Sequence, residues 1–253
     1  MDAKRIVGQD WRDAGAYAPL LEADRPLFAW EWLRRDPRYA EAAAVSEANP
    51  AYSGGAARFG LLSFEDPALS VPHARPLWGA RADPYVLAVG LRGDREPGDR
   101  FDARRFGALA TIAADEREDH LLLSDGLRAV RLDGPAGAFK AGPRCLAYRL
   151  HGIAAAQRPL LTLRRFLALC RRGRFSRLLH RREPRARRWI LMLRAYDALS
   201  CGATQRDIAE QLFSRSAGAP RWRSREASVR SQAQRLVRSV REFSSGGYRK
   251  LLR

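Results

Sequence analysis

The chain has 253 residues, and 46 Lys and Arg against 28 Asp and Glu give it a formal net charge of +18. A hydrophobic content of 46% supports a buried core and argues against a disordered chain. The positive charge is concentrated: residues 156–253 hold 25 basic and 6 acidic residues, whereas residues 1–155 hold 21 and 22. A region with a net charge of +19 predicts an acidic polymer as its partner.

Several classes of protein are disfavoured by what the sequence lacks. Cys145, Cys170 and Cys201 lie far apart, without the Cys or His spacing of a zinc site, and such sparse cysteines fit a reducing compartment. No phosphate-binding glycine loop and no Ser–His or Cys–His constellation is found, so we expect no cofactor, no metal and no enzyme activity. Neither a signal peptide nor a stretch of about 18 apolar residues is present, which predicts a cytoplasmic protein without membrane contact.

The first region, residues 1–80, is predicted to be helical and mixed. Aromatic and aliphatic residues recur between residues 10 and 48, Pro26 suits the first turn of a helix over 26–35, and Pro37 ends it. A second short helix is expected over 39–47. Residues 49–84 are rich in Pro, Gly and Ala and are predicted to be a loop with short extended pieces.

The second region, residues 81–155, is predicted to be a small antiparallel sheet unit. Strands are expected over 85–91 and 144–150, and residues 120–132 indicate a hairpin around Asp125 and Gly126, a dipeptide favoured in tight turns. A helix is expected between them, over 103–114. The fold class predicted for the whole chain is therefore α+β.

The third region, residues 156–253, is predicted to be an all-α helix-turn-helix domain. Thr162 is expected to cap a helix over 163–172 that ends at Gly173. A helix over 185–199 should be followed by a second over 205–213, with Thr204 as its N-cap. Ser224 is expected to cap a third helix over 225–243.

The third of these helices carries the residue types that read DNA. Its apolar residues fall on one face at spacings of three and four, which leaves an arginine-rich face for a ligand. The apolar face is expected to consist of Val229, Ala233, Leu236, Val240 and Phe243. Arginine pairs favourably with guanine and glutamine with adenine in the major groove. The candidate base contacts are Arg225, Arg230, Ser231, Gln234 and Arg235. The candidate phosphate contacts are Arg206, Arg223, Ser224 and Arg238.

Alternative interpretations remain open for these residues and for two other segments. The arginine face of the third helix could be an ordinary solvated surface of a helical bundle. The basic stretch 162–182 could lie on anionic lipid, although a helix of the DNA-binding domain is favoured because Gly173 interrupts the stretch. Residues 115–120 could be a metal or acid–base cluster, but a solvated polar segment before a strand is favoured.

The sequence also resembles a known family. The stretches GATQRDIAEQLF, PRWRSREASVRSQAQRLVRSVREF and GGYRKLLR are similar to the C-terminal domain of bacterial regulators of integrative and conjugative elements, and TLRRFLALCRRGRF extends the likeness. The stretch WRDAGAYAPLLEADRPLFAWEWLRRDPRYA resembles the N-terminal transcriptional regulator-like domain that accompanies it. The resemblance marks Thr204, Arg206, Trp222, Arg230, Arg235 and the tail 246–248 as features of the DNA-binding unit.

The resemblance implies a sequence-specific transcription activator of mobile-element excision or transfer genes, with double-stranded DNA as its partner. RNA polymerase or an antiactivator protein is a further candidate partner. Two alternatives stay open: an architectural excision factor that bends DNA, and a protein-interaction module such as an antiactivator. The first would bind at an attachment site and not upstream of a promoter. The second would bind a partner protein more tightly than DNA.

Overall fold

The structure, a computed structural model, describes residues 9–48, 50–93, 97–213 and 222–252. The N-terminal part consists of the 3-10 helix η1 (Gly15–Glu22), the helices α1 (Arg25–Leu33) and α2 (Pro37–Ala48), and the 3-10 helix η2 (Pro50–Phe59). Proline stands in the first turn of α1, as the sequence predicted. Helix α2 begins at Pro37, two residues before the predicted start. Trp30, Trp32 and Tyr39 are almost completely buried, because their large rings fill the core between these helices.

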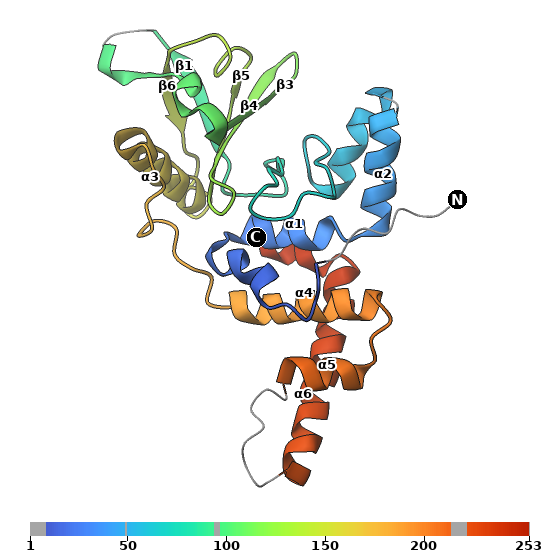
Figure 1. Cartoon of the computed structure of the whole chain (residues 1–253). Helices are drawn as coiled ribbons and strands as arrows, with labels where there is room; N and C mark the ends of the chain where they lie inside the picture. Colours follow the sequence, from blue (N-terminus) through green and yellow to red (C-terminus); the bar gives the residue numbers. More distant parts are fainter. Residues whose placement is uncertain (1–8, 49, 94–96, 214–221, 253) are drawn as a thin grey trace.

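The middle of the chain forms one curled sheet of six strands (Figure 1). The strands are β1 (Leu87–Arg92), β2 (Arg100–Phe101), β3 (Ala110–Ala114), β4 (Glu118–Ser124), β5 (Ala129–Pro135) and β6 (Arg144–Arg149), in the order β2-β6-β1-β5-β4-β3. The predicted hairpin is confirmed: β4 and β5 pair antiparallel across a turn in which Gly126 has a φ of 89°.

Two predictions for the sheet are wrong. The sheet is mixed and not antiparallel, because the hairpin turns β5 into the direction of β1, and the two strands pair in parallel with Leu87 opposite Leu132. The helix expected over 103–114 is a 3-10 helix, η4 (Ala103–Leu109), followed by β3. Gly107 breaks the helix with φ 49° and ψ −124°, and Ile112 then pairs with Leu121 in the sheet, where a β-branched residue packs well.

The last third of the chain is helical. It contains α3 (Gln157–Arg172), α4 (Ala186–Ser200), α5 (Gln205–Phe213), α6 (Trp222–Ser244) and the 3-10 helix η5 (Gly247–Leu252). The bounds of α5 are those predicted. Thr162 is not a cap, because α3 begins five residues earlier and the Thr162 hydroxyl donates to the Tyr85 carbonyl at 2.6 Å. Ser224 is not a cap either, because α6 begins two residues earlier, at Trp222.

The hydrophobic residues form two cores. One core joins buried residues between Trp11 and Trp78 with residues from Ala186 to Leu252, so the N-terminal helices and α4, α5, α6 and η5 pack together. The other core joins the sheet to α3, through Phe166 and Leu169. The predicted boundaries at residues 80 and 155 stay a prediction about folding units, but these cores group the segments differently.

Candidate nucleic-acid interface

Helix α6 is the element that the sequence assigned to DNA reading. It has 23 residues, which corresponds to a length of about 34 Å at 1.5 Å per residue. Its first half projects beyond α4 and α5, away from the rest of the chain (Figure 1). A projecting helix of this kind can enter a DNA major groove, which is about 12 Å wide.

The inner face of α6 anchors the helix. Ala233, Leu236 and Val240 are buried as predicted, and Val237, which the prediction left out, is 2% exposed. Val229 and Phe243 are only half-buried. Leu236, Val237 and Val240 belong to the same core as residues of α4 and Ile208 of α5, so the orientation of the outer face is set by apolar packing.

The outer face carries most of the predicted base contacts. The side chains of Arg230, Gln234 and Arg235 are exposed, whereas Ser231 is half-buried. Arg225 lies in the first turns of α6, and its side chain falls outside the described residues. In the part of the chain that the structure describes, no acidic partner is found for Arg230 or Arg235, so their guanidinium groups can bind a ligand.

The predicted phosphate contacts lie on two helices. Arg206 of α5 is exposed and forms an ion pair with Glu210, with Nε 2.8 Å from Oε1, so a phosphate would have to compete with that carboxylate. Arg238 is exposed on α6. Arg223 and Ser224 lie in the first turn of α6, with side chains outside the described residues. These candidates therefore lie on two packed helices, α5 and α6.

The start of α5 is held by reciprocal hydrogen bonds. The Thr204 amide and hydroxyl both donate to the Asp207 carboxylate at 2.8 Å, and the Asp207 amide donates to the Thr204 hydroxyl at 3.2 Å. This is the capping-box arrangement, and it confirms Thr204 as the N-cap. The two hydrogen bonds from Thr204 lower the pKa of Asp207, so its carboxylate stays charged at the helix N-terminus, where negative charge is favoured.

Helix α4 is joined to α1 by buried charges that the sequence did not reveal. Arg35 donates to Asp197 of α4 from Nε at 2.7 Å and from Nη2 at 2.8 Å, and it also contacts Glu31. Tyr17 donates its hydroxyl hydrogen to Asp197 at 2.5 Å. Burial lowers the pKa of a guanidinium, but Glu31 and Asp197 raise that of Arg35 above its usual value. This cluster fixes the helical unit of α4, α5 and α6 to the N-terminal helices.

Arg194 shows that the arginines of the C-terminal region do not all face solvent. It is 8% exposed and donates to the backbone carbonyls of Trp11 at 2.8 Å and Arg12 at 3.1 Å. A sequence does not distinguish a buried arginine from an exposed one. The one signal for Arg194 is its position on the apolar face of α4.

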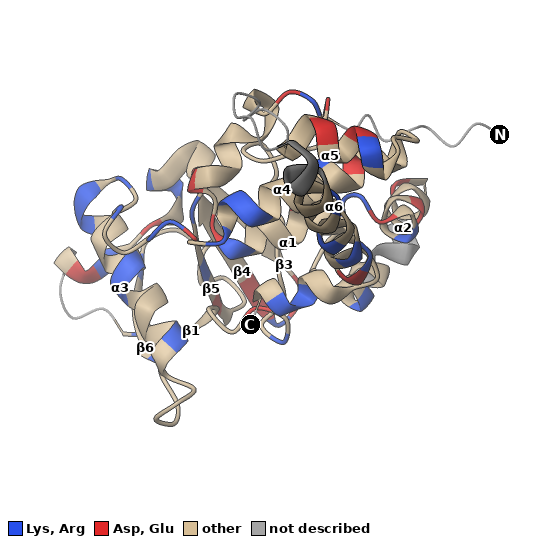
Figure 2. Cartoon of the chain, turned by 90° about the horizontal axis from the view of Figure 1, so that it is seen from below, with Lys and Arg blue, Asp and Glu red and all other residues tan. Residues whose placement is uncertain are grey.

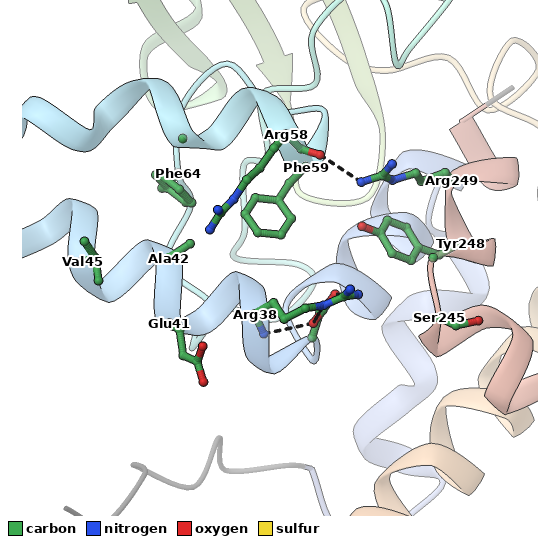
Figure 3. A pocket seen from close by; sticks show the side chains of 13 residues that line it. Arg38, Glu41, Ala42, Val45, Arg58, Phe59, Phe64, Ser245, Tyr248 and Arg249 are labelled. Carbon is green, nitrogen blue, oxygen red and sulfur yellow. Dashed lines mark hydrogen bonds and ion pairs between the residues drawn. The ribbon is translucent and has the colours of Figure 1, made fainter.

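A pocket lies where α2 and η2 meet the C-terminal tail. Its volume is about 860 Å³, and Arg38, Phe59, Phe64, Tyr248 and Arg249 are among the residues that line it (Figure 3). Arg249 donates to the Arg58 carbonyl at 2.9 Å, which ties the tail after α6 to the N-terminal helices. Burial raises the pKa of Tyr248, so its hydroxyl stays neutral.

The candidate acid–base cluster at residues 115–120 is divided between the turn at 115–117 and the start of β4, where Asp119 and His120 are buried. Asp115 accepts hydrogen bonds from the amides of Arg117 and Glu118 at 2.8 Å, and these bonds lower its pKa. His120 contacts Asp133 of β5 at 2.8 Å. Over the described ranges no group of three or more His, Cys, Asp or Glu could hold a metal ion. None of the described helices is long and apolar enough to cross a membrane.

Comparisons with known proteins assign both ends of the chain. Residues 150–253 match a family model described as "T6SS, Transcription factor, DNA binding domain". Residues 10–61 match a model described as "Proteobacterial transcriptional regulator-like domain". No curated protein and no solved structure matches the chain. The two matched domains, with α6 and its exposed arginines inside the first, support a DNA-binding transcription regulator.

Proposed function

We propose that the chain is a sequence-specific activator of transcription that binds double-stranded DNA through a helix-turn-helix formed by α4, α5 and α6. In this proposal α6 enters the major groove. Arg225, Arg230, Ser231, Gln234 and Arg235 contact bases, and Arg206, Arg223, Ser224 and Arg238 contact phosphates. The mechanism is equilibrium binding, in which no covalent bond is made or broken.

One observation carries the proposal: Arg230, Gln234 and Arg235 are exposed on α6. The opposite face of the helix is buried from Ala233 onward, and the first half of the helix projects away from the rest of the chain. Packing holds the helix, so the polar face can enter a groove without losing the contacts that fold it. Base contacts in such arrangements come from the N-terminal part of the recognition helix. Arg230 and Arg235 lie in the first two-thirds of α6, while Arg238 lies further on.

The N-terminal helices are proposed to contact RNA polymerase or a regulatory partner protein. Residues 1–155 have nearly balanced charge, so they add little to DNA affinity, yet the Arg35–Asp197 contact couples them to α4. The proposal for which genes are regulated is based on similarity to other proteins. The sequence resemblance points to excision or transfer genes of a mobile element, whereas the matched model carries T6SS in its description.

The test begins by selecting bound sequences from a random DNA pool with the full chain. Binding of Arg230→Ala, Arg235→Ala and Arg238→Ala to the selected duplex and to a scrambled duplex is then measured over a salt series. Loss of a base-reading arginine should cost about 1–3 kcal/mol on the selected duplex alone. Loss of a phosphate contact should weaken both duplexes and lower the salt slope by about 0.9.

The exposed Arg92 of β1 supplies the matched control, because Arg92→Ala removes the same charge outside the helical unit. Equal losses on both duplexes for Arg230→Ala and Arg235→Ala would contradict base reading by these two residues. A selected site that maps to an attachment site and is sharply bent on binding would favour the architectural factor. Tight binding to a partner protein with weak binding to every duplex would favour the antiactivator.

A further inference from the structure

The densest group of arginines in the chain lies outside α6, from the end of α3 to the start of α4. Residues 171–188, here named the arginine segment, contain nine arginines and one acidic residue, Glu183. All nine arginine side chains are exposed. Arg182 forms an ion pair with Glu22, and no ion pair with a described residue is found for the other eight. The arginine segment therefore presents a concentrated and largely uncompensated positive charge.

The backbone of the arginine segment is held in place although most of it is not helical. Phe175 is buried in the core of the sheet and packs against His180, with ring centroids 5.5 Å apart. His180 in turn contacts Asp24 at 3.1 Å, next to α1. Glu183 forms an ion pair with Arg25 at 2.5 Å. These anchors reach both cores, so the arginines project from a fixed support, which lowers the cost of ordering them on binding.

We propose that the arginine segment is a second DNA-binding surface, which takes the sugar-phosphate backbone of the duplex beside the site read by α6. This inference rests on the proposed function, because it presumes that α6 holds the DNA. Arginine presents a planar fork that fits phosphate oxygens, so an ordered row of arginines suits a polyanion. Contacts of this kind increase affinity without reading sequence.

The arrangement of the helices places this surface within reach of the same duplex. The arginine segment descends from α3 to the start of α4, toward the side of the molecule from which α6 projects (Figure 1). Seen from that side, Lys and Arg residues run from α3 to α4 (Figure 2). Helix α4, whose first turn ends the arginine segment, has 15 residues, which gives it a length of about 22 Å. Because phosphates follow one another every 3.4 Å along a strand, that length corresponds to about seven base pairs.

The chemistry of the arginine segment favours a nucleic-acid backbone over the other polyanionic surfaces. Binding to a membrane surface needs several bulky apolar side chains at the interface, and Leu178 is the exposed large hydrophobic residue of this segment. Nine arginines with a single carboxylate among them, Glu183, which is paired with Arg25, fit the uniform negative charge of a phosphate backbone. The match of residues 150–253 to a DNA-binding domain model includes the whole arginine segment. This match supports DNA as the polyanion that the segment binds.

The test compares the full-length chain with Arg174→Ala/Arg177→Ala/Arg181→Ala, a triple variant of exposed residues. The matched control is Arg92→Ala/Arg117→Ala/Arg144→Ala, which removes the same charge at the end of the sheet opposite the β4–β5 turn. The probes are a duplex of about 15 base pairs that holds the selected site and one of about 40 base pairs, extended by roughly one helical turn or more on each side.

On the long duplex, loss of three phosphate contacts should lower the salt slope by about 2.7, at 0.9 per contact. From about 50 to about 200 mM salt, the affinity of the wild-type chain should then fall about 40-fold more than that of the triple variant. The affinity gained by lengthening the duplex should disappear in the triple variant. The preference for the selected over a scrambled sequence should remain, because α6 is unchanged.

If thermal unfolding shows that the first triple variant is poorly folded, the measurement is repeated with a second one, Arg172→Ala/Arg185→Ala/Arg188→Ala. An unchanged salt slope and an unchanged length dependence would overturn the inference and direct attention to an acidic partner protein. Equal effects in the control variant would also overturn it, by showing that only net charge matters. Failure of the wild-type chain to bind any duplex would instead refute the proposed function itself.

Discussion

Replacing Asp197 with alanine should show how strongly the helical unit depends on the N-terminal helices. The Asp197 carboxylate is 4% exposed and accepts two hydrogen bonds from Arg35 and one from Tyr17. The substitution leaves Arg35, 5% exposed, with Glu31 as its remaining acidic partner, and it leaves the Tyr17 hydroxyl without that acceptor. Both groups stay buried, because apolar residues of the shared core surround them.

The expected cost follows from this burial. Removal of one member of a buried ion pair destabilises a protein by about 3–5 kcal/mol, since the remaining charge is uncompensated. The loss of the acceptor for Tyr17 adds to this as an unsatisfied buried hydroxyl, at about 1–3 kcal/mol. Because Glu31 still compensates part of the charge on Arg35, we expect a total of about 4 kcal/mol.

The assay is urea-induced unfolding of the full chain, followed by circular dichroism and by tryptophan fluorescence. Glu210→Ala is the control, since it breaks the exposed Arg206–Glu210 pair, whose loss should cost about 0.2–1 kcal/mol. A loss below about 1 kcal/mol for Asp197→Ala would refute the reasoning, because it would mean that the pair carries no more than a surface ion pair does.

Three further predictions follow from single residues. Gly126→Ala should destabilise the chain by about 1–3 kcal/mol in urea unfolding, because φ is +89° and a Cβ would lie 1.9 Å from the Pro72 carbonyl oxygen. Thr204→Ala should cost about 0.5–2 kcal/mol through loss of the α5 cap, whereas Thr204→Ser should restore most of it. Burial raises the pKa of Glu31, but Arg35 and Arg34 hold it below its usual value of 4.5, so its charge stabilises the fold above that pH. Stability should fall as the pH drops below 4.5 toward the folded pKa, and Glu31→Gln, although less stable at neutral pH, should lose less over that range.

The sequence alone determined the local elements whose signals lie within a few residues. The cap and bounds of α5, the hairpin at Gly126, the end of α3 at Gly173 and the inner face of α6 were all predictable. Each depends on side chains that contact their own backbone neighbours or on the 3.6-residue period. The clustering of positive charge after residue 155 and its meaning for a DNA partner were likewise visible in composition.

The tertiary structure decided which segments share a core. Residues 11–78 pack with residues 186–252, although the sheet and α3 lie between them in the sequence, and no local period reports a partner more than 100 residues away. The same limit applies to β3, where sheet pairing of Ile112 with Leu121 outweighed the helical preference of the alanines around it. The burial of Arg35 and Arg194 could not be predicted from the sequence either. It depends on distant groups such as Asp197 and the Trp11 carbonyl, which only the folded chain brings to these arginines.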